Sequence, residues 1–146
     1  MRLTMFLLLV LASLASHAQS WPAKPVRLIV PFGAGGATDI VARVYAGRFT
    51  EMWGQQVVVD NRGGSAGTIG TEIAARAAPD GYTFILGTLG NLAVNPSLYR
   101  MLPFDVMKDF APVQKVVDVH FVMVAHPSLP VRTAKDLVAL ARARPG

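Results

Sequence analysis

The residues most suited to binding chemistry are glycines that follow a short apolar run. Residues 26–30 are mostly β-branched and are closed by a proline, which suits the end of a buried parallel strand. Three glycines in residues 33–36 then allow a tight turn and a close approach by a ligand. Thr38 or Asp39 can cap the helix that follows, and a helix start attracts anions through its free N–H groups. We therefore expect a cradle for an anion, either a carboxylate or a phosphate.

Two further glycine-rich segments occupy similar places along the chain. Residues 62–70 contain four glycines, and residues 87–91 contain two. A single glycine-rich turn is usually only a turn. Two such turns at equivalent positions, both without bulky side chains, can present two helix starts to one anion. Because Arg62 is the only basic residue in the first two turns, backbone N–H groups, with or without waters, would hold such an anion.

The sequence contains no recognisable catalytic set. His120 and His126 lie on or beside expected strands without metal-ligand spacing to Glu or Asp, so we expect both to be structural or exposed. Residues 63–67 are only superficially similar to a Gly-x-Ser-x-Gly nucleophile elbow, and the Gly-Lys-Ser/Thr end of a phosphate-binding loop is missing from the sequence. We therefore expect no catalytic residues, no metal site and no cofactor.

A dinucleotide-binding fold is the main alternative for the first turn. Gly33-x-Gly35 follows a strand and opens a helix, and Asp60 ends the next strand, where such folds place the acid that binds a ribose. The third glycine position of that fingerprint falls on Thr38, however, where close packing of helix on strand needs Gly or Ala. The simpler interpretation of Asp39 and Asp60 is a helix cap and a turn residue.

The glycine turns need a scaffold of alternating strands and helices. Strand, turn and helix follow one another three times, which predicts a parallel sheet with helices on its faces and a ligand at the carboxyl ends of its strands. The expected strands are 26–30, 56–59 and 82–86, with two more strand-like runs at 113–119 and 121–125. The expected helices are 40–52, stopped by Gly54, then 69–78, a short turn at 95–99, and a last helix that starts at Thr133–Asp136 and runs through 142 or 144. The apolar stripe of the first helix is Ile40, Val41, Val44, Tyr45, Phe49 and Met52.

The first 18 residues have the pattern of a cleaved secretory signal peptide. Residues 3–15 are almost continuously apolar, and Ser16 and Ala18 place small side chains at a cleavage site. The apolar run is shorter than the roughly 20 residues that a bilayer crossing needs. The net charge of +5 is spread along the chain rather than clustered with aromatic residues, so we expect no nucleic-acid binding. An exported chain without cysteine must rely on core packing instead of disulfides.

In these motifs the chain resembles the Bug receptors, the extracytoplasmic solute receptors of tripartite tricarboxylate transporters. The resemblance begins at Pro25–Gly36 with Thr38 and Asp39, and continues through Val57–Arg62 with Gly64, Ala66, Gly67 and Gly70. It then runs through Ala78–Thr83, Asn95-Pro96, Leu98-Tyr99 and Lys108–Val113. These motifs are collinear and cover the whole chain after the expected signal peptide.

The resemblance implies an α/β fold of the periplasmic binding protein type II kind, with two lobes and a core of parallel strands flanked by helices. Residues 19–115 would form most of the first lobe, which carries the ligand-binding glycine turns. Residues 116–146 would begin the second lobe, most of which lies beyond residue 146 in the family. We therefore expect this sequence to be a truncated N-terminal part of such a receptor.

The resemblance also implies capture of a solute rather than catalysis. A monomeric receptor in the periplasm would hold a small carboxylated solute by backbone N–H groups and deliver it to the membrane permease subunits of the transporter. Carried onto this sequence, the residues of the first two turns that contact the ligand are Phe32, Gly33, Ala34, Gly35, Gly36, Thr38, Asp39, Ser65, Ala66, Gly67 and Thr68. Thr88 and Asn91 in the third turn are candidates for the rest of the ligand. A secreted enzyme stays the second class of hypothesis, because an acid/base pair could lie in the part of the family that follows residue 146.

Overall fold

The computed structural model describes residues 21–120 and 122–144. The signal peptide expected at residues 1–18 therefore lies outside the described residues. The chain divides into two compact units, one that ends at Ala111 and one that begins at Pro112. Each unit is described by itself below.

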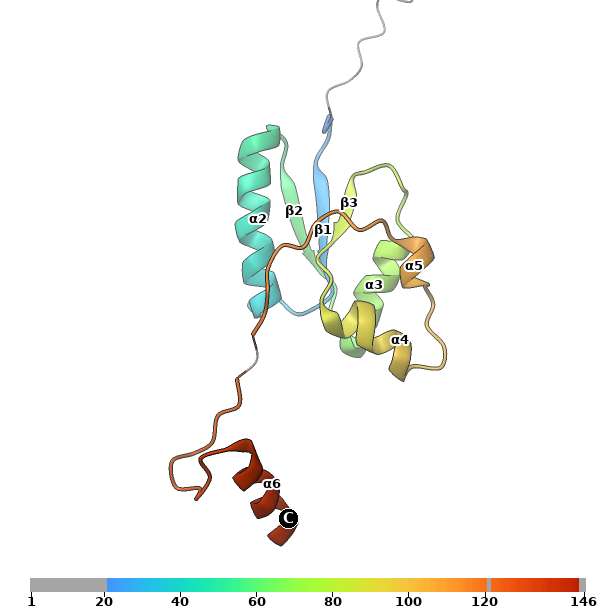
Figure 1. The fold of residues 1–146 in the computed structure, drawn as a ribbon. Coiled ribbons are helices and arrows are strands. Elements are labelled where there is room, and N and C mark those ends of the chain that lie inside the picture. The colour runs from blue at the N-terminus through green and yellow to red at the C-terminus, as the bar shows by residue number, and fades with distance from the viewer. Residues whose placement is uncertain (1–20, 121, 145–146) are drawn as a thin grey trace, which may run out of the picture. The chain divides into compact units, whose positions relative to one another are not determined.

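A three-stranded parallel sheet forms the centre of the first unit. Its strands are β1 (Val26–Val30), β2 (Val57–Asn61) and β3 (Thr83–Ile85), in the spatial order β2-β1-β3. Ile29 of β1 is in register with Asp60 on one side and with Ile85 on the other. Because the strands are parallel, all three glycine-rich turns follow the same edge of the sheet (Figure 1). The predicted parallel α/β sheet is thus confirmed.

Helices cover the sheet and build its loop edge. Figure 1 shows α2 (Ala37–Trp53) and α3 (Thr68–Ala75) on opposite sides of the strands. The short elements are a 3₁₀ turn η1 (Ser65–Gly67), a π-helical turn η2 (Gly90–Val94), α4 (Asn95–Leu98) and α5 (Val106–Asp109). The prediction that the second helix extends to residue 78 is wrong by about one turn, and the third glycine turn continues directly into helix at Gly90. No helix in the described residues has the length and hydrophobicity that a bilayer crossing needs.

The core of the first unit lies between β1 and α2. Val26, Leu28 and Val30 are buried against Ala42 and Ala46. The predicted apolar stripe of this helix is therefore partly wrong, because Ile40, Val44 and Met52 are exposed. Alanines face the sheet instead, and their small side chains let the helix lie close to the strands. Gly54 ends the helix in a left-handed conformation as predicted, with its N–H donating to the carbonyl of Thr50.

Aromatic rings close the edge of the sheet that is opposite the glycine turns. Trp53, in the last turn of α2, stacks on Phe49 at a centroid distance of 4.5 Å and meets Trp21 edge-on at 4.9 Å. Trp21 also approaches Tyr82, just before β3, at 6.1 Å. This cluster of aromatic rings thus lies at the amino ends of the strands, away from the glycine turns.

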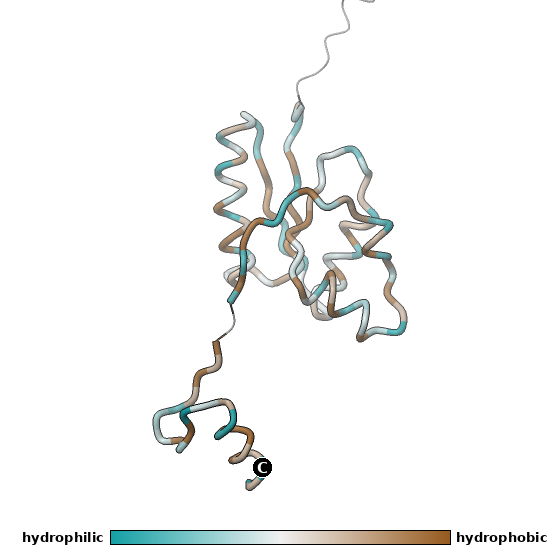
Figure 2. The backbone as a smooth tube through the Cα atoms, in the orientation of Figure 1, coloured by the Kyte–Doolittle hydropathy of each residue, from teal (hydrophilic) through white to brown (hydrophobic). Residues whose placement is uncertain are grey.

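The second unit contains one helix, α6 (Ala134–Ala143), among its described residues. The predicted capping box is confirmed, because Thr133 Oγ1 accepts from the N–H of Asp136 and the Asp136 carboxylate accepts from the N–H of Thr133. The strands predicted at 113–119 and 121–125 are wrong for the described residues, which form no strand there. A strand needs a partner for its backbone N–H and C=O groups. No strand in the described part of the chain pairs with residues 113–119 or 122–125. The hydrophobic stretch that follows residue 121 stands out in brown in Figure 2.

Two glycine substitutions test how closely α3 approaches β1. A Cβ at Gly70 would lie 2.5 Å from the carbonyl oxygen of Arg62 and 2.7 Å from Cα of Pro31. We expect Gly70→Ala to destabilise the fold by about 1–3 kcal/mol, because it overpacks this contact between backbones. Gly47→Ala is the matched control, since a Cβ there meets nothing within 4 Å on the exposed side of α2. It should stabilise the fold by about 0.5–1 kcal/mol in the same urea unfolding experiment. Equal effects of the two substitutions would contradict the close approach.

Candidate functional site

The first two glycine turns touch each other at the carboxyl ends of β1 and β2. A Cβ at Gly63 would lie 3.2 Å from the backbone nitrogen of Gly33. A Cβ at Gly67 would lie 3.4 Å from the ring of Phe32. The two segments meet closely enough that a side chain at Gly63 would be crowded, which makes them one continuous surface of backbone.

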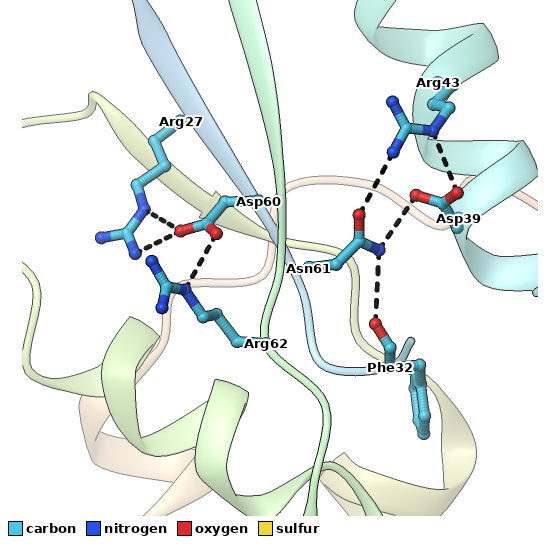
Figure 3. A network of polar contacts seen from close by, with 7 residues as sticks. All are labelled: Arg27, Phe32, Asp39, Arg43, Asp60, Asn61 and Arg62. Atoms are coloured by element: carbon cyan, nitrogen blue, oxygen red, sulfur yellow. Dashed lines mark hydrogen bonds and ion pairs between the residues drawn. The ribbon is translucent and has the colours of Figure 1, made fainter. Parts of the chain in front are cut away.

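A buried carboxylate holds the first turn to the start of α2. Asp39 is 3% exposed, and its Oδ2 accepts from the N–H of Gly35 at 2.8 Å and from Arg43 Nε at 2.9 Å. Its Oδ1 accepts from Asn61 Nδ2 at 2.9 Å, and the same amide nitrogen lies 3.3 Å from the carbonyl oxygen of Phe32 (Figure 3). Asp39 therefore links the turn, the helix and the end of β2.

The expected cap of α2 is different in the structure. The residue before the helix is Gly36, which has an extended conformation and no side chain to cap with. Thr38 lies inside the first turn of the helix, so it is not the cap, and Asp39 lies one residue further in. The Asp39 carboxylate reaches back past the helix start to the N–H of Gly35. The N–H groups of the first helical turn are left without a side-chain cap.

The hydrogen bonds around Asp39 also set its protonation. The hydrogen bond from Arg43, followed by those from Gly35 and Asn61, lowers the pKa of the Asp39 carboxyl to about 2, and partial desolvation opposes this shift. The carboxylate is therefore ionised at any physiological pH, and its charge is neutralised by Arg43.

The second turn has an unusual backbone. Four successive residues have positive φ: Gly64 at 125°, Ser65 at 48°, Ala66 at 53° and Gly67 at 89°. For Ser65 and Ala66 this left-handed conformation is strained, because a side chain disfavours it. Such strain persists only where the surrounding structure determines the conformation.

Hydrogen bonds from buried side chains hold this second turn. Asn95 Nδ2 donates to the carbonyl oxygen of Ala66 at 3.0 Å, and Thr71 Oγ1 donates to that of Gly67 at 2.8 Å. Asn91 Nδ2 donates to Thr71 Oγ1 at 2.8 Å, and its Oδ1 accepts from the N–H and the hydroxyl of Thr88. The third turn is thus connected to the second through side chains.

Several N–H groups of the two turns are available to a ligand. The backbone N–H groups of Gly33, Ala34, Ser65 and Ala66 donate no hydrogen bond to any residue in the described part of the chain. These residues are exposed. Exposed donors beside a helix start can hold an anion without any basic side chain.

Asp60 is on the opposite side of β2 from Asn61, as the alternation of a strand requires. Its Oδ2 accepts from Arg27 Nε at 2.8 Å and also from Arg27 Nη2, and its Oδ1 accepts from Arg62 Nε at 2.9 Å (Figure 3). Partial burial raises the pKa of Asp60, but the hydrogen bonds from the two arginines outweigh it and keep the pKa below its ordinary value. Both carboxylate oxygens are already used, which does not suit the ribose-binding acid of the dinucleotide alternative.

The predicted ligand residues differ in exposure: Phe32, Thr38, Thr68 and Thr88 are half-buried, and Gly67 is buried. Gly33 to Gly36, Ser65 and Ala66 are exposed in the two touching turns. Asp39 and Asn91 are buried, and each uses both ends of its side chain inside the protein. Asn61, Thr71 and Asn95 support the turns and were not among the predicted ligand residues. The signal that could have identified them is a polar residue at the end of a strand, as for Asn61, or in a helix beside a glycine turn, as for Thr71 and Asn95.

Replacement of Asp39 tests the role of its charge. Since the pKa of Asp39 in the folded protein is about 2 and the ordinary value for an aspartate is 3.8, its ionisation stabilises the fold above the higher value, and this stabilisation is lost as the pH falls toward the lower one. Asp39→Asn should lower the melting temperature at pH 7, and the difference from the unaltered chain should shrink between pH 4 and about pH 2. Thermal unfolding followed by circular dichroism across this range measures it. A difference that does not change with pH would contradict the role of the charge.

Comparisons with known proteins agree with the resemblance in the motifs. Residues 41–146 match the family described as the tripartite tricarboxylate transporter family receptor. A relative, Protein BugT of Bordetella pertussis (strain Tohama I), is 45% identical over 130 residues, which cover 88% of this chain and 40% of that protein. This chain spans about two fifths of the length of the curated relatives it matches.

Solved structures of such proteins share the fold. The structure of periplasmic binding protein BugD is 46% identical, with a TM-score of 0.60 over 63% of this chain and 30% of that chain. R. palustris Rpa4515 with adipate is 41% identical, with a TM-score of 0.69 over 85% of this chain and 42% of that chain. These similarities confirm the expected fold class, of which this chain covers a part. The chain therefore belongs to the receptor family of the tripartite tricarboxylate transporters.

Proposed function

We propose that this chain forms the carboxylate-binding part of a solute receptor, in which two glycine turns hold a small carboxylated solute by their backbone N–H groups. The single observation that carries the proposal is the contact between the turns, which brings the free N–H groups of Gly33 and Ala34 next to those of Ser65 and Ala66. Binding of adipate by R. palustris Rpa4515, a protein of similar fold, supports a carboxylate as the ligand.

Capture by this surface requires no chemistry. The donors are part of the backbone and are held in place before the ligand arrives, so little conformational entropy is lost when a carboxylate binds. Asp39 helps by fixing the N–H of Gly35 and the start of α2, while Arg43 neutralises its charge and so reduces its repulsion of an anion. The selectivity for one acid over another would come from groups that contact the far end of the solute.

The place of this receptor in transport follows from the family. We propose that it works in the periplasm after removal of residues 1–18, as a monomer, and that it delivers its solute to the membrane permease subunits of a tripartite tricarboxylate transporter. The name of BugD as a periplasmic binding protein supports the location. An enzyme remains the alternative class, and the pairing of Asp60 with two arginines gives no support to its dinucleotide-binding form.

Binding of a dicarboxylate and of its neutral amide tests the proposal. We expect isothermal titration calorimetry with the full chain to detect binding of adipate or malate and no binding of adipamide, because only the acids carry the charge that the N–H groups recognise. Equal affinity for adipate and adipamide would contradict carboxylate capture. Binding of NAD in place of every acid would instead favour the dinucleotide alternative.

A charge placed on the first turn tests which surface binds the acid. A Cβ at Gly33 meets nothing within 4 Å, so Asp or Asn can replace Gly33 without a clash at Cβ. Gly33→Asp should weaken adipate binding by at least about tenfold, or about 1.4 kcal/mol, because it brings a second carboxylate to the anion site. Gly33→Asn, which has the same shape without the charge, is the matched control and should retain most of the affinity. Unchanged binding in both variants would place the ligand elsewhere.

A further inference from the structure

Three buried polar side chains lie under the second glycine turn. Thr71 and Asn91 are 0% exposed, and Asn95 is 4% exposed. They belong to different elements: Thr71 lies in α3, Asn91 lies in η2, and Asn95 is the first residue of α4. Burial of uncharged polar groups is costly unless each is hydrogen-bonded. Every buried side-chain nitrogen or oxygen among the described residues has a partner, so the arrangement is fully satisfied.

The directions of these hydrogen bonds follow from the chemistry of the groups. A backbone N–H can only donate, and that of Thr88 contacts the side chain of Asn91 at 2.8 Å, so this atom of Asn91 is its oxygen. The hydroxyl of Thr88 must then also donate to it, at 2.9 Å. The amide nitrogen of Asn91 is left to donate to Thr71, whose own hydrogen goes to the carbonyl of Gly67. All bonds run in one direction, from the third turn toward the second.

The contacts of these side chains coincide with the strained part of the turn. Asn95 binds the carbonyl of Ala66, and Thr71 binds the carbonyl of Gly67, which are successive residues with positive φ. Asn91 and Asn95 are four residues apart in continuous helix, which puts them on one face. A Cβ at Gly67 would lie 3.1 Å from Cβ of Asn91, so the turn also rests directly on this side chain. Because side-chain hydrogen bonds fix the carbonyl groups of two successive residues, the turn has little freedom to relax.

We propose that Thr71, Asn91 and Asn95, here named the asparagine clamp, are positioning residues for the ligand site. The clamp holds residues 64–67 in their left-handed path and so fixes the N–H groups of Ser65 and Ala66 for an anion. Ligand affinity depends on the clamp although its members bind protein atoms. Asn91 thus has a positioning role in place of the direct ligand contact expected from the family. This inference rests on the proposed function for its effect on affinity, and on the geometry alone for its effect on the turn.

A pair of substitutions at Thr71 separates the clamp from simple packing. Thr71→Val keeps the shape of the side chain and removes its hydroxyl, whereas Thr71→Ser keeps the hydroxyl and removes a methyl group. The N–H groups of Gly67 and Thr68 donate within the turn, to the carbonyls of Gly64 and Ser65, so their hydrogen exchange in the ligand-free chain reports on the turn. We expect exchange at these two amides to be at least about tenfold faster in Thr71→Val than in Thr71→Ser.

The same variants are then compared in binding to adipate. Thr71→Val should lose at least about tenfold in affinity, and Thr71→Ser should stay within about threefold of the unaltered chain. Asn95→Asp gives an independent route if Thr71→Val does not fold, since it puts an oxygen in place of the nitrogen that donates to Ala66. It should speed exchange at Gly67 and Thr68 in the same way.

The two measurements fail independently. Equal exchange at Gly67 and Thr68 in the Val and Ser variants would overturn the clamp, whatever the binding result. Faster exchange with full adipate affinity would overturn its role in positioning the site. If the unaltered chain binds none of the dicarboxylates, the proposed function fails, and the exchange data still decide whether the clamp holds the turn.

Discussion

The contact between backbones at the carboxyl ends of β1 and β2 is the constraint on which the rest of the structure depends. Gly63 lies tightly against Gly33, and Gly70 lies against Pro31 at a distance that leaves no room for a Cβ. Such contacts cannot be made by side chains, because the segments themselves must touch. They bring two turns with free N–H groups together and at the same time seat α3 on the sheet. The glycines therefore serve the fold and the candidate site by the same contact.

The closely packed turns contain backbone groups that need hydrogen-bond partners, and buried side chains provide them. Asp39 with Arg43 and Asn61 supports the first turn, and Thr71, Asn91 and Asn95 support the second. The two networks differ in kind. The first contains a carboxylate and an arginine, so it responds to pH, whereas the second is uncharged and depends on the shape of amide and hydroxyl groups. Neither network covers the exposed surface of the turns, which consists mainly of backbone.

The aromatic cluster and the candidate binding turns lie at opposite ends of the strands. The rings of Trp21, Phe49, Trp53 and Tyr82 gather at the amino ends, and the glycine turns lie at the carboxyl ends. A parallel sheet produces this polarity because all of its strands point the same way. The strained residues Ser65 and Ala66 persist at the carboxyl edge because buried side chains hydrogen-bond to the carbonyls of the turn there.

The sequence by itself determined the alternation of strands and helices, the glycine turns and their common edge, the stop at Gly54 and the capping box of α6, because each depends on residues close together in the chain. It did not determine which face of α2 is buried, since both alanines and larger apolar residues follow the helical repeat and only the distance to the sheet chooses between them. It predicted strands at 113–119 and 121–125 from composition, but pairing depends on a partner elsewhere. The roles of Asp39 and Asn91 were likewise decided by tertiary structure, because a polar side chain near a turn can face either the ligand or the protein. Arg43 and Thr88 are close to these residues along the chain, but only the fold brings Asn61 to Asp39 and Thr71 to Asn91.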